Sequence, residues 1–368
     1  MALSRIDTTN MIEDVPQSKL DNNINFRNII INGSMDIAQR GTSKSSIGFE
    51  YGTVDRFQTV QGSLGAFTQS QSTDVPTGQG FSKSLKMDCT TADASPSSGD
   101  ELYVRQMFEG QNLQYLLKGT SSAKSLTVSF WVKSNKTGTY IVELFDSDNS
   151  RHINKSYTIS SSDTWEKKTI TYDGDTTGAF NNDNAASLHL AFMLGAGSNF
   201  TSGTLQTSWG TSTSANRQVG QVNLADSTSN EWYITGVQLE AGTTASDFEF
   251  LPVDVNLRRC QRYYFLKVSG TAQAISVATY YTGSSMRMSV SFPVTMRSAP
   301  SIDVETVTNG YQMNRNSGQD YVNTFDINAP SLVETQLIND TQASGTAGQA
   351  GTLLTNSSSS FLAFNSEL

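Results

Sequence analysis

Strict alternation of apolar and polar residues in residues 125–134, SLTVSFWVKS, is the feature that most constrains the fold of this chain. The apolar side chains at every second position are Leu126, Val128, Phe130 and Val132. Because successive side chains of a β-strand point to opposite faces, this pattern predicts a strand with one face in a hydrophobic core. The opposite face is polar except for Trp131, so it is only half covered and leaves apolar area to bury.

Similar segments recur at short intervals along the chain. Period-two patterns are present at residues 84–89, 102–108, 140–144, 165–172 and 188–194. The glycine-containing turn at residues 136–138 predicts that residues 140–144 form the antiparallel partner of residues 125–134. Evenly spaced strands over ~200 residues predict an antiparallel two-sheet sandwich or jelly roll.

The composition agrees with a mostly β protein that has room for more than one domain. Proline is scarce, at 7 of 368 residues, and aromatic residues make up 10% of the chain. Serine, threonine, asparagine and glycine are abundant, as expected of short, turn-rich strands, whereas long helices need more alanine, glutamate, lysine and leucine. A chain of 368 residues accommodates about two domains.

A change of character near residue 252 predicts the boundary between these domains. Alternation runs through residues 231–240, where one face of a strand is expected to carry Tyr233, Thr235, Val237 and Leu239. It resumes at residues 247–250 as another short strand, which ends at Pro252 because proline cannot donate to a ladder. The chain then becomes basic and aromatic. We therefore predict a jelly-roll β-sandwich at residues 28–252 and a smaller C-terminal β-domain at residues 253–368.

The N-terminal region divides into two parts. Residues 1–27 are polar and only weakly periodic, so they cannot bury enough apolar surface to order themselves. They are either a free tail or a leader that folds on a partner. Three isoleucines at residues 29–31 predict the first buried strand, followed by a turn at Asn32 and Gly33 and a second strand from Met35.

Several blocks of the sequence resemble bacteriophage tail-fibre and receptor-binding proteins. The blocks are NGSMDIAQRGTS at residues 32–43, YGTVDRF at 51–57, QMFEG at 106–110, ITGVQLEAG at 234–242, CQRYY at 260–264, FPVTMRSAPS at 292–301 and FLAFNSEL at 361–368. In that family, a carbohydrate-binding-module-like jelly roll precedes a smaller C-terminal β-domain. The opening MALSRIDTTNMI is similar to the short leaders by which such fibres attach to the virion.

This resemblance implies a virion component, part of a tail fibre, that is made in the host cytoplasm. Residues 1–27 are then a leader that docks onto the virion tail or an adaptor protein, the subunits form a homotrimer, and the fibre attaches to host-surface glycan. No signal peptide is recognisable, and no segment approaches the ~18 apolar residues of a membrane helix. The net charge of −9 argues against binding nucleic acid, because phosphate contacts need clustered lysine and arginine.

No motif for phosphoryl, acyl or hydride transfer is present, and we predict no catalytic residue. His152 and His189 lie apart from each other and lack the spacing of metal ligands. Cys89 and Cys260 lack CxxC spacing, which predicts two buried thiols and neither a disulfide nor a zinc site. Glycan cleavage is the enzymatic alternative, because it requires only two converging carboxylates. The available acidic side chains include Glu143, Asp146, Asp148, Asp173, Asp175 and Glu240.

Two acidic turns bear on the question of a metal. The runs DSD at residues 146–148 and DGD at residues 173–175 resemble half of a calcium loop, but neither contains the full ligand set of an EF-hand. We interpret them as solvated turns and predict no cofactor. A structural calcium stays open through the resemblance alone, since carbohydrate-binding jelly rolls often hold one. Asp55 and Arg56 are expected to form a local ion pair at the start of a strand.

Aromatic residues in turn-like surroundings are the candidate contacts for glycan. Trp209 is isolated in the polar segment of residues 199–230, where it is either an anchor that pins the loop or a platform for sugar stacking. Tyrosines beside glycine, serine and asparagine in the C-terminal domain suggest turns or rims, which either complete the structure or contact glycan. These tyrosines are Tyr280, Tyr281, Tyr311 and Tyr321.

Together these features predict a non-catalytic tail-fibre subunit that attaches the virion to host-surface glycan, with the C-terminal domain facing the host. One alternative is a structural virion protein, such as a head fibre or an adaptor extension, that binds no receptor. The other is a glycan-cleaving depolymerase. Phage depolymerases often contain repeat-built parallel β-helices, and the absence of an internal repeat in this sequence disfavours that alternative.

Overall fold

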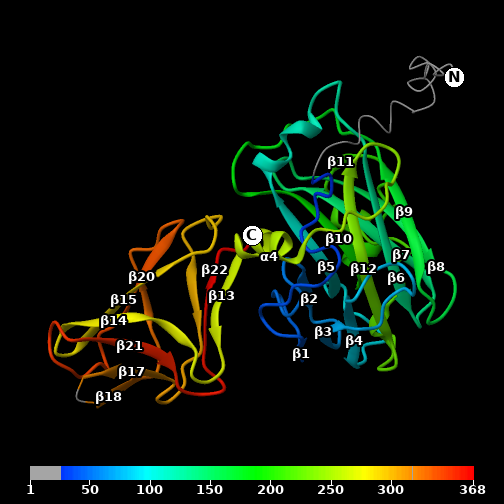
Figure 1. Cartoon of the computed structure of the whole chain (residues 1–368). Helices are drawn as coiled ribbons and strands as arrows, with labels where there is room; N and C mark the ends of the chain where they lie inside the picture. Colours follow the sequence, from blue (N-terminus) through cyan, green and yellow to red (C-terminus); the bar gives the residue numbers. More distant parts are fainter. Residues whose placement is uncertain (1–25, 317) are drawn as a thin grey trace, which may run out of the picture.

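The computed structural model describes residues 26–316 and 318–368, which form two lobes joined by a helix (Figure 1). Strands make up most of the regular structure in both lobes, so the prediction of a mostly β protein is confirmed. The first lobe, called the sandwich below, contains strands β1 to β12, and the C-terminal lobe contains β13 to β22. The predicted leader, residues 1–27, lies outside the described residues except for Phe26 and Arg27.

The sandwich consists of two six-stranded antiparallel sheets that face each other across a hydrophobic core. The first sheet has the order β1 (Ser43–Lys44), β3 (Ala66–Ser72), β4 (Ser84–Thr91), β12 (Glu231–Ala241), β6 (Leu126–Ser134) and β9 (Glu166–Tyr172). The second has the order β11 (Gly210–Thr211), β8 (Arg151–Ile159), β7 (Gly138–Asp146), β10 (Ala186–Ala196), β5 (Glu101–Glu109) and β2 (Gln58–Gly62). The predicted antiparallel sandwich is therefore confirmed.

Strand β6 lies where its alternation predicts, but its expected neighbour does not. The alternating apolar residues from Leu126 to Val132 are buried in the core, and Trp131 on the other face is half-buried. The ring of Phe130 lies 5.1 Å from the ring of Phe192 in the opposite sheet. Residues 140–144 do not pair with β6, because the chain crosses after β6 and β7 joins the second sheet. Strand β6 pairs instead with β9 and β12.

The predicted faces of β12 are wrong in its second half. The register with β6 shifts between Thr235 and Gln238, so the strand contains a bulge there. Gly236 lies at the shift with φ of +62°, a backbone conformation that glycine adopts without steric cost. A bulge adds one residue and inverts the phase of alternation. The core-facing side chains are therefore Trp232, Ile234, Val237 and Leu239.

The strands predicted at residues 29–31 and from Met35 are also wrong. This segment runs through turns, and the buried side chain of Asn32 replaces the hydrogen bonds that a sheet would supply. Its amide nitrogen donates to the carbonyl oxygens of Ile37 at 2.8 Å and Asp55 at 3.1 Å. Its side-chain oxygen accepts from the amide of Ile37 at 3.0 Å. The apolar run is explained by burial and not by a strand: the side chain of Ile30 packs in the core, while the backbone of residues 29–31 forms no strand.

The C-terminal lobe has a core of its own between two further antiparallel sheets. The smaller sheet has the order β13 (Tyr264–Ser269), β22 (Phe361–Asn365) and β16 (Ser301–Val304). The larger sheet has the order β18 (Gly318–Val322), β17 (Tyr311–Arg315), β21 (Ala350–Thr355), β14 (Ala274–Thr282), β15 (Ser285–Ser291), β20 (Glu334–Asn339) and β19 (Asp326–Asn328). The alternating methionines Met286 and Met288 of β15 face this core, as their spacing predicts.

The segment between the lobes lacks the strand expected at residues 247–250 and contains a helix that was not expected. No strand forms at residues 247–250; Phe248 and Phe250 pack with Phe81, with ring centroids 4.8 to 5.1 Å apart. Helix α4 (Val253–Gln261) follows Pro252, so the predicted domain boundary falls at the first residue of this helix. The free thiols of Cys89 and Cys260 are both buried, as expected. No helix in the described part of the chain is long and apolar enough to cross a membrane.

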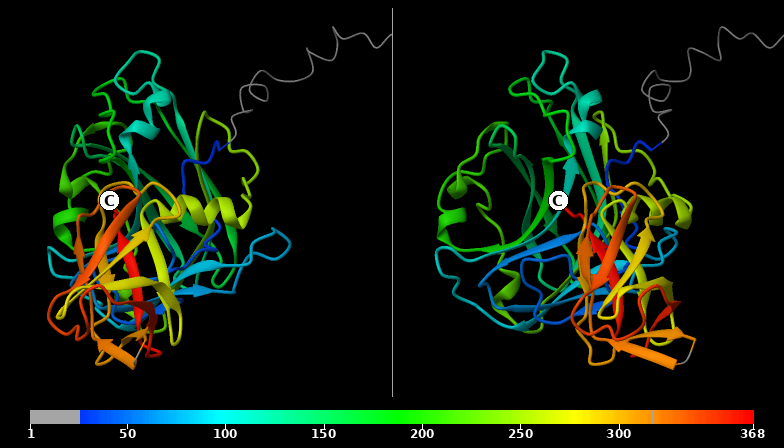
Figure 2. Two further views of the ribbon diagram at one scale, coloured as in Figure 1. Left: turned by 60° about the vertical axis from the view of Figure 1, so that its left-hand side comes forward. Right: turned by 90° about the vertical axis from the view of Figure 1, so that its left-hand side faces the viewer.

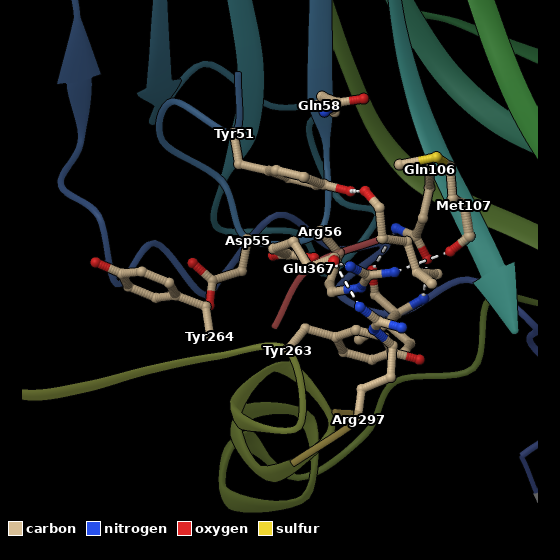
Figure 3. Close-up of polar contacts among 12 residues, drawn as sticks. Tyr51, Asp55, Arg56, Gln58, Gln106, Met107, Tyr263, Tyr264, Arg297 and Glu367 are labelled. Carbon is tan, nitrogen blue, oxygen red and sulfur yellow. Dashed lines mark hydrogen bonds and ion pairs between the residues drawn. The ribbon is translucent and has the colours of Figure 1, made fainter. Parts of the chain in front are cut away.

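A buried arginine of the sandwich holds the two lobes together (Figure 3). The side chain of Arg56 is 1% exposed, and its guanidinium lies 3.5 Å from the ring centroid of Tyr263. It donates to the carbonyl oxygen of Met107 at 2.8 Å and forms an ion pair with Glu367 near the C-terminus. Asp55 does not pair with Arg56 but accepts two hydrogen bonds from Gln39, so the expected local ion pair is wrong.

Most blocks that resemble the fibre family meet at this junction. Figure 1 places the C-terminus between the lobes, beside helix α4, and Figure 2 shows the two lobes from two further directions. Arg297 donates to the main-chain oxygens of Ser366 at 2.6 Å and Glu367 at 2.8 Å. Arg262 donates twice to Glu109, at 2.8 and 2.7 Å. The block at residues 260–264 thus contacts the block at residues 106–110 of the sandwich, whereas the bonds of Arg297 hold the C-terminal block within its own lobe.

We expect Arg56→Ala to lower the free energy of unfolding by about 3–5 kcal/mol, because Glu367 would lose its main partner while staying buried. The matched control is Lys44→Ala, which removes an exposed ion pair with Glu50 and should cost no more than about 1 kcal/mol. Urea unfolding measures both values. Equal stabilities of the two variants would show that Arg56 does not hold the lobes together.

Candidate functional site

The aromatic residue Trp209 is an anchor for its loop. Its side chain is half-buried against the sandwich core, and its indole nitrogen donates to the carbonyl oxygen of Asp173 at 2.8 Å. The ammonium group of Lys118 lies 5.6 Å from the centre of the Trp209 ring. Of the two interpretations of Trp209 in the sequence, the structure therefore favours the anchor.

The candidate tyrosines of the C-terminal lobe do not form one site. All lie in strands and none in a turn, and Tyr321 is on β18, an edge strand of the larger sheet. Tyr280 and Tyr311 are buried in the core, where their hydroxyl groups donate to Asp320 at 2.6 Å and to the carbonyl oxygen of Phe361 at 2.6 Å. Tyr281 and Tyr321 are exposed, at 68% and 36%. Only these last two tyrosines are able to contact a ligand without unfolding of the lobe.

A cleft of about 190 Å³ lies on the outer face of the second sheet of the sandwich. Its floor is Ala191 of β10, which pairs with Arg105 of β5 on one side and Glu143 of β7 on the other. Because the side chain of Ala191 is much shorter than those of Arg105 and Glu143 on either side, a hollow remains above it on the surface of the sheet. The remaining lining residues from the sheet are Tyr103, Phe145 and His189.

The long segment of residues 199–230 forms the other wall of the cleft. It is held to the sheet edge by β11, which pairs with β8, and by a hydrogen bond of 2.8 Å from the amide of Asn154 to the carbonyl oxygen of Gln206. It contributes Ser212, Ser214 and Arg217 to the lining. The segment flagged in the sequence as a long polar loop is thus ordered and builds part of a binding surface.

An ion pair fixes the charge at one end of the cleft. Arg217 donates to both carboxylate oxygens of Glu143, at 2.9 and 2.7 Å, and His152 contacts the same carboxylate at 3.1 Å. Burial alone would raise the pKa of Glu143, but the Arg217 guanidinium outweighs it and lowers the pKa to about 2. The same pairing raises the pKa of Arg217 despite its burial. Both groups are therefore charged and mutually neutralised at every ordinary pH.

His189 presents a neutral imidazole at the opposite end. Burial, followed by the nearby Arg105 guanidinium, lowers the pKa of His189 to about 3. Its Nδ1 lies 3.5 Å from the Arg105 guanidinium, and its Nε2 has no hydrogen-bond partner within residues 26–316 and 318–368. The ring packs edge-on against Phe145, with centroids 5.3 Å apart. This nitrogen is itself buried, so a ligand in the cleft does not reach it while the surrounding side chains keep their positions.

The arrangement suits a small polyhydroxylated ring. The two members of the ion pair neutralise each other. Among the described residues, the Arg105 guanidinium has polar contacts only with the uncharged side chains of Gln58 and His189, so it can donate to a hydroxyl group. The hydroxyl groups of two serines both donate and accept, and Tyr103 and Phe145 supply apolar ring surfaces. Such pockets combine a few fixed polar groups with aromatic walls.

The acidic turns suspected of binding calcium converge on a lysine. The ammonium group of Lys118 lies 2.5 Å from Asp146 and 3.1 Å from Asp175, and it donates to the carbonyl oxygens of Thr177 at 3.0 Å and Gly178 at 2.6 Å. Both carboxylates are buried, so the expectation of solvated turns is wrong for them. Lys118 occupies the position that a cation bound by these oxygens would take.

The cleft residues could be predicted only in part from the sequence. Tyr103, Arg105 and His189 lie on the more polar faces of alternating segments, but His189 lacks the spacing of a metal ligand and no sequence pattern assigns it to a binding site. Their convergence depends on the order β7-β10-β5, in which sequence neighbours are not neighbours in the sheet. No local pattern marks Arg217, which reaches Glu143 across 74 residues of chain.

Comparison with known proteins gives distant likenesses only. No family model matches the sequence, and no curated protein matches it. The enzymatically active domain of tailspike protein 4 from bacteriophage CBA120 is similar over 59% of this chain and 22% of its own length, with 13% identity and a TM-score of 0.31. A family 11 carbohydrate-binding module from Clostridium thermocellum is similar over 55% of this chain and 98% of its own, with 12% identity and a TM-score of 0.26. At these scores the likeness supports no inference about this chain.

The depressed pKa of His189 predicts a pH-dependent stability. An unfolded histidine titrates near pH 6.5, whereas His189 in the folded protein titrates near 3. Between these values the unfolded state binds one proton more, so the free energy of unfolding falls with falling pH by up to ~1.4 kcal/mol per pH unit. In His189→Asn we expect a flatter dependence between pH 6.5 and about 5, where Glu143 stays ionised in both proteins. Parallel profiles from urea unfolding would contradict this.

The cage around Lys118 predicts a second, independent effect. Lys118→Met leaves the buried carboxylate of Asp146 without a counter-charge, whereas Asp175 keeps its ion pair with Arg151. The substitution should lower the free energy of unfolding by about 3–5 kcal/mol. Because carboxylate and carbonyl oxygens are calcium ligands, added Ca²⁺ should partly restore the melting temperature of this variant and leave the wild type unchanged. Lys136→Met, at the more exposed pair with Asp226, is the control for losing a lysine. A Ca²⁺ response of the wild type would contradict this interpretation.

Proposed function

We propose that this protein binds glycan without cleaving it, through the cleft on the outer face of the sandwich. The observation that supports this most is the composition of the cleft wall. The floor of the cleft is Ala191. Around it lie the neutral imidazole of His189, the ion pair of Arg217 and Glu143, two serines and the rings of two aromatic residues. A sugar ring uses these contacts, and the Arg105 guanidinium, which among the described residues has polar contacts only with uncharged side chains, can donate to one of its hydroxyl groups.

The carboxylates near the cleft support a non-catalytic role. Glu143 is 1% exposed, and its two oxygens already accept hydrogen bonds from Arg217. With a pKa of about 2 it cannot hold the proton that a general acid must donate. The second carboxylate, Glu101, lies 3.6 Å from the same guanidinium, so Arg217 contacts both groups. A glycosidic bond therefore has no access to the space between them, where cleavage would require it.

We further propose that the protein is a tail-fibre subunit of a bacteriophage, present in the virion as a homotrimer. The sequence blocks that resemble the fibre family support this, as do their positions at the junction between the lobes. In this proposal, residues 1–27 dock onto the virion tail or an adaptor protein. Three copies of a weak sugar site would together give firm attachment to the host surface, because linked sites raise the effective concentration. The sandwich, and not the C-terminal lobe as the sequence suggested, then holds the glycan site.

Filling the cleft tests the proposed function. We expect Ala191→Leu to lower affinity for glycan at least tenfold, because the added side chain occupies the floor of the hollow. Tyr281→Ala, which removes an exposed ring of the C-terminal lobe, should leave binding unchanged. Binding is measured on a glycan array and by adsorption to host cells, with melting temperature as the check on folding. Loss of binding in Tyr281→Ala alone would move the site to the C-terminal lobe, and no glycan binding by the wild type would favour a structural virion protein.

A further inference from the structure

A second hollow of about 720 Å³ lies where the sandwich and the C-terminal lobe meet. The sandwich contributes Arg40, Phe49 and Tyr51 to its lining, and the C-terminal lobe contributes Asp303 and Phe361. We call this hollow the junction groove. Neither lobe forms it alone, so its shape depends on the contacts around Arg56 that hold the lobes together (Figure 3).

One pair of side chains separates the junction groove from the cleft. Arg105 lines the cleft and Gln58 lines the groove, and the Arg105 guanidinium donates to the Gln58 side-chain oxygen at 2.8 Å. The ring of Phe49 lies beside this pair, with its centre 5.6 Å from the Arg105 guanidinium. The two hollows are therefore neighbours on one surface, with Arg105, Gln58 and Phe49 between them.

The ring of Phe49 is an exposed apolar surface between the two hollows. Single exposed apolar residues are common on proteins and need no explanation. Phe49, however, is 64% exposed, contacts a cation and lies at the divide between two hollows. An aromatic ring in that position offers a stacking surface to a ligand that passes from one hollow to the other.

The sizes of the hollows favour a ligand that occupies both. Pockets that enclose a whole small ligand usually measure about 300–1,000 Å³. The cleft, at about 190 Å³, is smaller than this range, whereas the groove, at about 720 Å³, lies within it. A ligand held only by the cleft would be limited to about one ring, and the groove offers room for several more.

The charges of the junction groove favour a neutral ligand. Lys44 pairs with Glu50 at 3.6 Å, and Arg40 is held between the Tyr264 ring, at 3.6 Å from its centroid, and Glu367, at 3.4 Å. The lining also contains the carboxylates of Asp303 and Glu305, so acidic groups outnumber basic ones. A polyanion would be repelled, while hydroxyl groups can bond to both kinds of side chain.

We infer that the cleft and the junction groove are two parts of one binding surface, which takes an internal segment of a neutral polysaccharide chain and not a terminal sugar. This inference rests on the proposed glycan binding and adds the class of ligand. The chain runs from the cleft across the ring of Phe49 into the groove. The C-terminal lobe thereby contributes to recognition through the groove wall, although the tyrosines singled out in the sequence, from Tyr280 to Tyr321, do not line the groove.

The test uses the full-length protein and an array of neutral oligosaccharides in homologous series, from monosaccharide to octasaccharide. We expect the affinity of the wild type to rise with length beyond the short members that fill the cleft. Phe49→Ala should lower affinity for the long members about tenfold and leave the short members unchanged. Ser269→Trp, which places a large side chain at an exposed position in the groove, should also remove the gain with length. Thr279→Trp, at an exposed position in β14, is the matched control.

The outcomes separate this inference from the proposed function. If short and long members bind equally, and Phe49→Ala has no effect while Ala191→Leu abolishes binding, the cleft alone is the site and the inference is wrong. If Phe49→Ala weakens every length equally, Phe49 belongs to the cleft and the inference is wrong as well. If the wild type binds no member of any series, both the inference and the proposed function fail.

Discussion

The buried guanidinium of Arg56 is the interaction on which the arrangement of the two lobes depends. Removing a charge from water costs several kcal/mol unless it is paired and hydrogen-bonded. Arg56 meets that requirement only when Glu367 of the C-terminal lobe and the ring of Tyr263 are in place. Its backbone has φ of +73°, an uncommon conformation for a side chain of this size. The sandwich therefore reaches its lowest free energy only with the C-terminal lobe docked against it, and the junction groove is formed before any ligand arrives.

The sequence could predict strands wherever packing follows local alternation, as in β6, whose core face has the residues expected of it. It could not predict positions that depend on distant partners. The bulge at Gly236 inverts the faces of β12, and nothing in residues 231–241 marks it except one glycine. Tyr280 and Tyr311 have small polar neighbours in the sequence but large apolar ones in space, so local composition misplaced them at the surface. Which residues are buried depends on the order of the strands in the sheets, and that order cannot be deduced from the spacing of residues in the sequence.

The same limit explains the candidate site. The long polar segment of residues 199–230 was recognisable as unusual, yet its polarity indicated neither order nor the position of Arg217. The acidic turns were recognisable too, but their counter-ion, Lys118, lies in a different part of the chain. In both cases the recognisable segment contains one partner of a buried ionic contact. The other partner lies elsewhere in the chain, and no sequence pattern identifies it. What could be predicted is that such buried charges require partners.

The ion pair of Arg217 and Glu143 shows how stability and binding differ at the cleft. A buried pair often contributes little net stability, because the cost of desolvating two charges offsets their attraction. Well-packed apolar residues would fill the same space at no such cost. The pair does, however, hold the guanidinium of a loop residue rigidly beside the hollow over Ala191, so that little conformational entropy is lost when a ligand binds. The polar surface of the cleft is therefore preorganised. Its loop is anchored by Trp209, its arginine is fixed by a buried carboxylate, and the imidazole opposite is uncharged. Weak sugar contacts need this arrangement. Each sugar hydroxyl exchanges a hydrogen bond with water for one with the protein, so the contact contributes favourable binding free energy only when the protein group is already in position.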